Sequence, residues 1–212
     1  MNHDPKTRLM LILNWVRTLP VYWCYLKSRQ RRRIDMDLEV WAPWNRLEGC
    51  SPMTQLNYLL SCKPEFRNLL LHRFRNPEGS HLHYYIARLF WKPLDSLYLE
   101  TRDIGGGLYI QHGFATIVDA ESIGEYCWIN QQVTIGYTEK GHPILEDHVS
   151  VNCGAKVLGN VTMHRGSTAG AGAVVVKDVP ENAVVGGVPA KVIKWKHTSE
   201  ESEIYCIPPI YN

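Results

Sequence analysis

Apolar residues in the first half of the chain recur at steps of three and four, the spacing of one face of an α-helix. This spacing predicts helix over 56–74 and a shorter helix over 81–91. Ser51 followed by Pro52 is typical of a helix start, with a serine cap and proline in the first turn. The first half of the chain is therefore predicted to be helical.

The second half follows a different period, because an apolar residue recurs at every sixth position. Two breaks interrupt this register, at 111–116 and 136–144. The residues at the sixth positions are all apolar: Tyr98, Ile104, Ile110, Ile117, Ile123, Ile129, Ile135, Leu145, Val151, Val157, Met163, Ala169 and Val175. Such a period is typical of a solenoid in which each repeat forms a short strand and a tight turn.

Three such repeats complete one coil of a triangular prism, so the repeats predict about four coils. The apolar residue points into the prism, and small residues let the chain turn at the corners. We therefore predict a mainly β protein, a left-handed parallel β-helix with an N-terminal α-helical region. An ordinary β-sandwich is the alternative, but its strands would show a period of two. The predicted organisation is a helical region over 1–96, a β-helix domain over 97–194 and a tail over 195–212, to which no function is assigned.

Composition agrees with this division. Of the 16 glycines, 14 follow residue 100, and the two parts carry opposite charge, +7 over 1–95 and −5 over 96–212. The total net charge of +2 gives no overall field for a nucleic-acid partner. The six cysteines form no CxxC pair and are interpreted as reduced thiols. No cleavable signal is expected, and Asn14, Arg17 and Pro20 argue against a membrane-spanning helix over 9–26.

The two register breaks contain His112 and His142. An insertion in a solenoid has to leave the coil as a loop, and loops on a rigid scaffold are where function concentrates. Histidine has a pKa near ~6.5 and is therefore suited to act as a general base. These two side chains are the first candidates for a functional site.

Six segments of the repeat region resemble a known family. They are IGGGLYIQHG (104–113), WINQQVTIG (128–136), GHPILED (141–147), GAKVLGN (154–160), AGAGAVVVKDVP (169–180) and GGVPAKVIK (186–194). Residues 97–194 are similar to the hexapeptide-repeat acyltransferases, in particular to their serine acetyltransferase-like branch. The resemblance implies transfer of an acetyl group from acetyl-CoA to a hydroxyl by direct attack, in a homotrimer with one site in each groove between neighbouring prisms.

The same resemblance implies roles for individual residues. The catalytic histidine of the family falls at His112, and the second active-site histidine, which holds the acceptor, falls at His142. The backbone positions that meet coenzyme A correspond to Cys153 and Ala171, with Gly172 and Lys177 nearby. Lys177 is interpreted either as a phosphate partner or as a solvated turn residue.

Three positions depart from the family pattern. Leu97 replaces the aspartate that orients the catalytic histidine, and Glu100 is the candidate substitute. Gln111 replaces the aspartate that meets the amino group of serine, and Gly141 replaces the arginine that binds its carboxylate. Because an unpaired amino acid would lose hydration without compensation, the sequence favours a neutral acceptor, a saccharide of a surface polysaccharide or glycolipid. The alternatives are a serine O-acetyltransferase of cysteine biosynthesis and a non-catalytic trimeric scaffold.

Two other chemistries are considered and disfavoured. His112, His142, His148 and His164 offer enough ligands for zinc on paper, but the last two follow an unbroken register, so no metal is expected. Cys153 lies close to the proposed thioester, yet no neighbouring base indicates a nucleophile.

The N-terminal arm over 9–33 combines aromatic residues with a basic run, Lys27, Arg29, Arg31, Arg32 and Arg33. This combination suits the interface of an anionic membrane. The alternative is a helix packed on a neighbouring subunit. We expect a cytoplasmic protein, with peripheral contact at the inner face of the membrane as a hypothesis.

Overall fold

The structure is a computed structural model that describes residues 4–196 except residue 77. The chain separates into two compact units, residues 1–94 and 95–212. The predicted tail over 195–212 lies outside the described residues from 197 onward.

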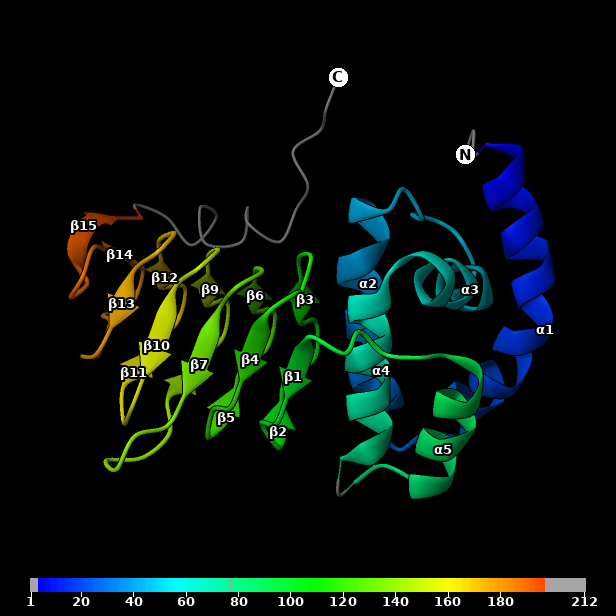
Figure 1. The fold of residues 1–212 in the computed structure, drawn as a ribbon, viewed down its shortest axis with the longest axis horizontal. Helices are drawn as coiled ribbons and strands as arrows, with labels where there is room; N and C mark the ends of the chain where they lie inside the picture. The colour runs from blue at the N-terminus through cyan, green and yellow to red at the C-terminus, as the bar shows by residue number, and fades with distance from the viewer. Residues whose placement is uncertain (1–3, 77, 197–212) are drawn as a thin grey trace. The chain divides into compact units, whose positions relative to one another are not determined.

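The first unit contains five helices: α1 (Pro5–Lys27), α2 (Arg31–Trp44), α3 (Pro52–Cys62), α4 (Pro64–Arg75) and α5 (His81–Phe90) (Figure 1). The predicted cap is confirmed, because the Ser51 hydroxyl accepts the backbone N–H of Thr54 at 3.3 Å. The predicted helix over 56–74 is two helices, since Pro64 follows the end of α3 and begins α4. The core of this unit includes Trp41, whose ring meets Phe66 edge to face.

A buried ion pair also crosses this core. Arg73 of α4 donates through Nε and Nη2 to the two carboxylate oxygens of Asp37 in α2, both at 2.9 Å. The two side chains are 1% and 2% exposed. Each charge is therefore compensated by the other, and neither is tolerated alone.

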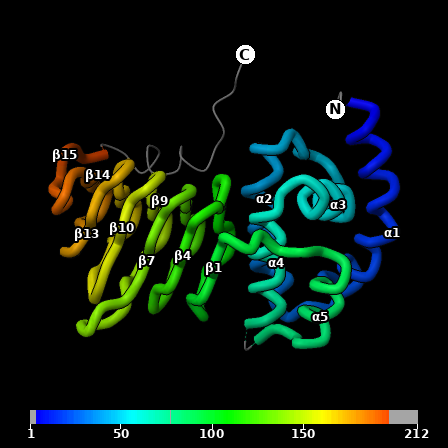
Figure 2. The backbone as a smooth tube through the Cα atoms, in the orientation of Figure 1, coloured from blue at the N-terminus to red at the C-terminus, as the bar shows by residue number. Residues whose placement is uncertain are grey.

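The second unit is a parallel β-helix, which confirms the predicted fold class (Figure 2). Its strands are β1 (Leu97–Leu99), β2 (Asp103–Ile104), β3 (Tyr109–Ile110), β4 (Thr116–Val118), β5 (Ser122–Ile123), β6 (Trp128–Ile129), β7 (Thr134–Gly136), β8 (Ile144–Leu145), β9 (Ser150–Val151), β10 (Lys156–Leu158), β11 (Thr162–Met163), β12 (Thr168–Ala169), β13 (Val174–Val175), β14 (Ala183–Gly186) and β15 (Lys191–Trp195).

These strands form the three faces of the prism. Face A is β1-β4-β7-β10-β13, face B is β2-β5-β8-β11, and face C is β3-β6-β9-β12-β14-β15. Face A has five strands, one coil more than the predicted four, because the last repeat position, Val175 in β13, begins a fifth coil that β14 completes on face C. β15 runs antiparallel to β14 and ends the stack.

The repeat residues fill the prism with two exceptions. Tyr98 and Ile117, predicted to point inward, are 53% and 45% exposed. They pair with each other across β1 and β4, while Val118 pairs with the inward Ile135. Side chains alternate along a strand, so a shift of one residue in these two coils turns the predicted core residues outward and buries Leu97 and Val118.

The described cysteines are free, as expected of reduced thiols: Cys24, Cys50, Cys62, Cys127 and Cys153. Burial in α1 raises the pKa of the Cys24 thiol to about 11. This thiol is therefore protonated and unreactive at neutral pH.

Candidate active site

The two register breaks lie on different edges of the prism. The CA edge comprises the turns that lead from face C to face A, residues 111–115, 130–133, 152–155 and 170–173, followed by the β14–β15 turn 187–190, which bonds to Val174 of face A. The AB edge comprises the turns from face A to face B, residues 100–102, 119–121, 137–143, 159–161 and 176–178. His112 belongs to the CA edge and His142 to the AB edge.

The CA edge is a column of left-handed turns. Gln132, Gly154, Gly172 and Gly187 all have φ between 59° and 91°, and His112 takes the same conformation at φ 67°. The turns stack by backbone hydrogen bonds, since Gly172 N–H donates to the carbonyl of Cys153 at 2.9 Å. A non-glycine residue at positive φ is uncommon and indicates a local constraint. This conformation holds His112 at the first corner of the column, where its side chain is exposed.

Three of the four predicted coenzyme A residues lie on the same edge. Cys153 is half-buried, and Ala171 and Gly172 are exposed. A Cβ built on Gly172 would meet no heavy atom within 4 Å, so the backbone of this turn is open to a ligand. Lys177 lies instead on the AB edge, after β13.

Gln111, beside the candidate base, is held in place by its neighbours. Its backbone N–H donates to the Ile129 carbonyl at 2.8 Å, and its side-chain oxygen accepts from the amide of Asn130 at 3.3 Å. Asn130 in turn accepts the indole N–H of Trp128. The side chain next to His112 is thus a fixed neutral amide.

No carboxylate reaches His112 within the described part of the chain. Leu97 is buried in β1 and its Cα pairs with Thr116. Glu100 lies on the AB edge, where its backbone N–H donates to the Val118 carbonyl. Glu100 and His112 are therefore at opposite ends of face A, and the structure does not bring them together.

His142 does have a carboxylate neighbour. Its Nδ1 lies 3.3 Å from Oδ1 of Asp119, and its ring packs 4.9 Å from that of Tyr137. The two polar atoms are close enough for an ion pair with a protonated imidazole, although they are not aligned as a hydrogen bond. The loop itself is closed by reciprocal 3.0 Å bonds between the backbones of Thr138 and Gly141.

Sequence reasoning missed Asp119. Its signal was present, because a carboxylate directly follows the strand residue Val118, one coil before the His142 loop. In a solenoid, residues one coil apart stack on each other.

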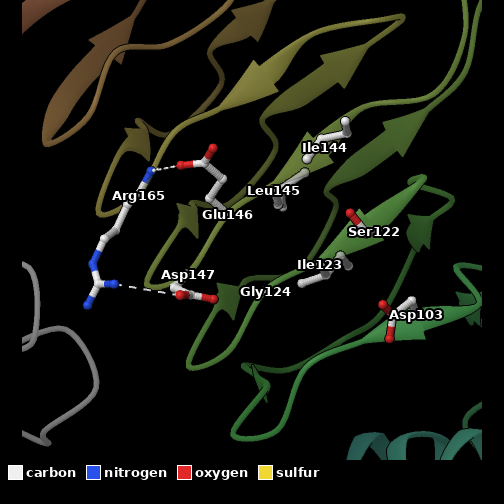
Figure 3. A pocket seen from close by; sticks show the side chains of 9 residues that line it. All are labelled: Asp103, Ser122, Ile123, Gly124, Ile144, Leu145, Glu146, Asp147 and Arg165. Atoms are coloured by element: carbon white, nitrogen blue, oxygen red, sulfur yellow. Dashed lines mark hydrogen bonds and ion pairs between the residues drawn. The ribbon is translucent and has the colours of Figure 1, made fainter.

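Two hollows lie on the described surface of the β-helix. One, of about 550 Å³, adjoins the His142 loop and is lined by residues 138–140, 158–161 and Val176. The other, of about 380 Å³, lies on face B and is lined by residues of β2, β5 and β8 and by the turn residues Glu146, Asp147 and Arg165 (Figure 3).

The charged groups around the face B hollow are already satisfied. Glu146 accepts the backbone N–H of Arg165 at 2.8 Å and lies 3.1 Å from Nδ1 of His164. Arg165 pairs with Asp147 at 3.7 Å, and Asp147 also accepts the Glu125 N–H at 2.8 Å. These contacts bind one coil to the next. Across residues 4–196 without 77, no group of three His, Cys, Asp or Glu side chains is placed to hold a metal ion.

The prism, its two interrupted corners and the glycine turns of the CA edge define a hexapeptide-repeat β-helix. The resemblance to the serine acetyltransferase-like branch is confirmed by relatives and by solved structures. No family model matches the chain.

Relatives of the chain are named serine acetyltransferase. The serine acetyltransferase of Synechococcus elongatus is 37% identical over 147 residues, which cover 64% of this chain and 59% of that protein. The chain thus spans about three fifths of that relative.

The solved structures agree with the fold. The serine acetyltransferase of Neisseria gonorrhoeae in complex with serine has a TM-score of 0.60 at 22% identity, over 91% of this chain and 85% of that one. The serine acetyltransferase of Brucella abortus in complex with coenzyme A has a TM-score of 0.52 at 25% identity, over 77% and 68%.

The prediction of a saccharide acceptor is wrong, because the relatives are serine acetyltransferases. That prediction assumed that the charges of an amino acid need partners at the positions of Leu97, Gln111 and Gly141. The structure shows charge at other positions, with the carboxylate of Asp119 beside His142 and the exposed Lys140 two residues before it.

Proposed function

We propose that this protein is an acetyl-CoA-dependent serine O-acetyltransferase. The observation that carries the proposal is the exposed His112, fixed at the head of an open column of turns in a chain related to serine acetyltransferases. An alcohol is a poor nucleophile at neutral pH, and the reaction therefore needs a general base to accept the hydroxyl proton, which His112 can supply.

In the proposed reaction, His112 accepts the hydroxyl proton of serine while the oxygen attacks the thioester carbonyl. The new C–O ester bond forms and the C–S bond of the tetrahedral intermediate breaks. The protonated imidazole then returns its proton to the leaving thiolate of coenzyme A. A base positioned in this way contributes roughly 10²–10⁴-fold to the rate.

The co-substrate is proposed to run along the CA edge, toward His112 from Ala171 and Gly172. Three features support this path: the open turn at Gly172, its bond to Cys153 in the next coil, and the coenzyme A found with the Brucella abortus relative.

The proposed enzyme is a homotrimer with sites between copies. Four residue steps separate Ala115 and Asp119, the residues that flank β4, or about 13 Å at ~3.3 Å per residue. His112 and His142 of one chain therefore face opposite ends of face A and cannot hold one small acceptor between them. A second prism that brings its AB edge to the CA edge of the first supplies His142, Asp119 and Lys177 to the site of His112.

An acetyl-transfer assay tests the proposed activity. We expect release of the coenzyme A thiol with L-serine, and a fall in turnover of roughly 10²–10⁴-fold for His112→Ala with retained binding of coenzyme A. His164→Ala is the matched control, because this histidine pairs with Glu146 away from both edges.

Three outcomes would contradict the proposal. Thiol release with hexoses and not with serine would exclude the acceptor. Unchanged turnover of His112→Ala would exclude His112 as the general base. If no acceptor supports thiol release, the non-catalytic trimeric scaffold is the remaining interpretation.

Subunit complementation tests the shared site. Chains with His112→Ala and chains with His142→Ala are each expected to be impaired, but a mixture reassembled after dissociation restores about a quarter of the sites by random assortment around a threefold axis. Absence of any recovery, in trimers shown by sedimentation to be mixed, would place both histidines in one chain's site.

Location in the cytoplasm remains a prediction. It agrees with the proposed reaction, since both acetyl-CoA and serine are cytoplasmic metabolites. The contact of the N-terminal arm with a membrane is a separate question, because it concerns the helical unit and not the edges of the prism.

A further inference from the structure

The outer side of α1 is apolar over its whole length. Eight large apolar side chains on it are exposed, led by Val16 at 72% and Ile12 at 66%. They are Leu9, Ile12, Leu13, Trp15, Val16, Leu19, Trp23 and Leu26. An amphipathic helix of a globular unit normally turns such a stripe toward its core.

α1 packs on its neighbours through the polar groups of Asn14 and Thr18 and, in its second half, through the buried Val21, Cys24 and Tyr25. Asn14 donates to the Ser61 hydroxyl at 3.0 Å, and Thr18 donates to the Asn57 side chain at 3.0 Å. Asn57 returns a 3.1 Å bond to the Leu11 carbonyl. These bonds to α3 fix the rotation of α1 about its axis. The apolar stripe, on the opposite side of the helix, therefore faces outward.

α5 continues the apolar surface. Trp23 of α1 meets the ring of His83 in α5 at 5.6 Å, and Leu82, Tyr85 and Leu89 of α5 are between 61% and 79% exposed. We call this surface the α1–α5 face. Apolar area gathered in this way on one surface marks an interaction site.

The charge along this part of the chain is mainly positive, although Asp4 caps α1 and Glu78 is bonded to Gln30. No acidic residue occurs between Pro5 and Ile34, and the basic residues of that stretch are Lys6, Arg8, Arg17, Lys27, Arg29, Arg31, Arg32 and Arg33. Arg31 is paired with Asp35 at 3.8 Å, and Arg17 is bonded to Asn14, so they contribute less. The stretch 80–94 adds Arg88 and Lys92 and no acid.

We propose that the α1–α5 face docks on the surface of an anionic lipid membrane, with α1 lying in the interface plane. Tryptophan and tyrosine with flanking cations are the composition that suits this depth. A second copy of the chain would bring a face of the same positive sign against it, which opposes self-association.

The proposal is docking and not insertion. By length and composition alone, α1 is long and apolar enough to cross a bilayer, but many core helices of soluble proteins are as well. Crossing would, however, carry the hydrogen-bonded partners Asn57 and Ser61 of α3 into hydrocarbon or leave Asn14 and Thr18 without them, and either is costly.

Co-sedimentation of the full-length protein with vesicles tests the docking. We expect binding to phosphatidylcholine vesicles that contain about 30% phosphatidylglycerol at ~50 mM salt, and much weaker binding to pure phosphatidylcholine or at ~500 mM salt. The double variant Ile12→Gln, Val16→Gln is expected to bind on the order of tenfold more weakly, since two exposed apolar side chains leave the contact. Ile193→Gln, an equally exposed change on β15, is the matched control.

Each other outcome overturns the proposal. Wild-type protein that stays in the supernatant at ~50 mM salt excludes docking. Equal binding by the double variant removes the α1–α5 face from it. If the wild type binds no lipid, and the double variant has a different oligomeric state in the absence of vesicles, a second copy of the chain is the occupant of the face. Retention on vesicles after alkaline extraction identifies a spanning helix. None of these results depends on acetyl transfer.

Discussion

Gly172→Ala should weaken acetyl-CoA without a matching loss of fold. Gly172 has φ +67°, and a Cβ added there meets nothing within 4 Å. The substitution therefore introduces only the left-handed strain of an L-residue, about 1–2 kcal/mol. For a domain of about 100 residues, ~1 kcal/mol lowers the melting temperature by roughly 4–8 °C. The added methyl group stands where the co-substrate is proposed to approach the backbone.

Gly49→Ala provides the control. Gly49 also has positive φ, at +71°, and also has open space around its Cβ, but it belongs to the helical unit. The two variants should show the same small loss of stability in thermal melts. Only Gly172→Ala should raise KM for acetyl-CoA, by about tenfold, which corresponds to ~1.4 kcal/mol of lost binding.

The pair of variants separates two explanations. If Gly172→Ala matches Gly49→Ala in melting temperature and leaves KM for acetyl-CoA within about twofold, the co-substrate does not follow the CA edge at this coil. Titration of free coenzyme A by calorimetry would give the same answer without turnover.

Two further predictions concern charge. Asp119→Asn keeps the size of the side chain but removes the charge 3.3 Å from His142, an interaction worth about 1 kcal/mol in a water-like dielectric. KM for serine should therefore rise roughly fivefold with kcat little changed, and Asp119→Glu should recover part of the loss. A change confined to kcat would refute this positioning role. Arg73→Met removes the guanidinium that pairs with the buried carboxylate of Asp37 and should lower the free energy of unfolding by about 3–5 kcal/mol. Adding Asp37→Leu should restore most of this loss in urea denaturation. An unimproved double variant would show that lost packing, and not charge, causes the destabilisation.

The period of six predicted the β-helix because a buried ladder needs an apolar residue in every repeat. It did not predict that Val118 would replace Ile117 in the core, since both are apolar and only the length of the preceding loop decides which one turns inward. Pro64 ended one helix and began another within an unbroken apolar pattern.

The candidate site was only partly predictable for a related reason. His112 and His142 were marked by the register breaks, which are properties of the sequence. The contact between Asp119 and His142 depends on how two coils stack across an inserted loop, which no spacing records. The same gap led to the wrong acceptor, because missing charges were counted at aligned positions while charges from other positions were not considered.

The antiparallel β15 affects whether copies of the β-helix can stack end to end. A stack of parallel coils exposes an unpaired strand edge at its end, and identical prisms can add to each other there without limit. β15 covers the last parallel strand of face C, and its irregular register with β14, together with Lys191 and Lys194, makes a poor template for a further strand. On face C, the strand that ends the fold therefore opposes the growth of concentrated protein into fibres.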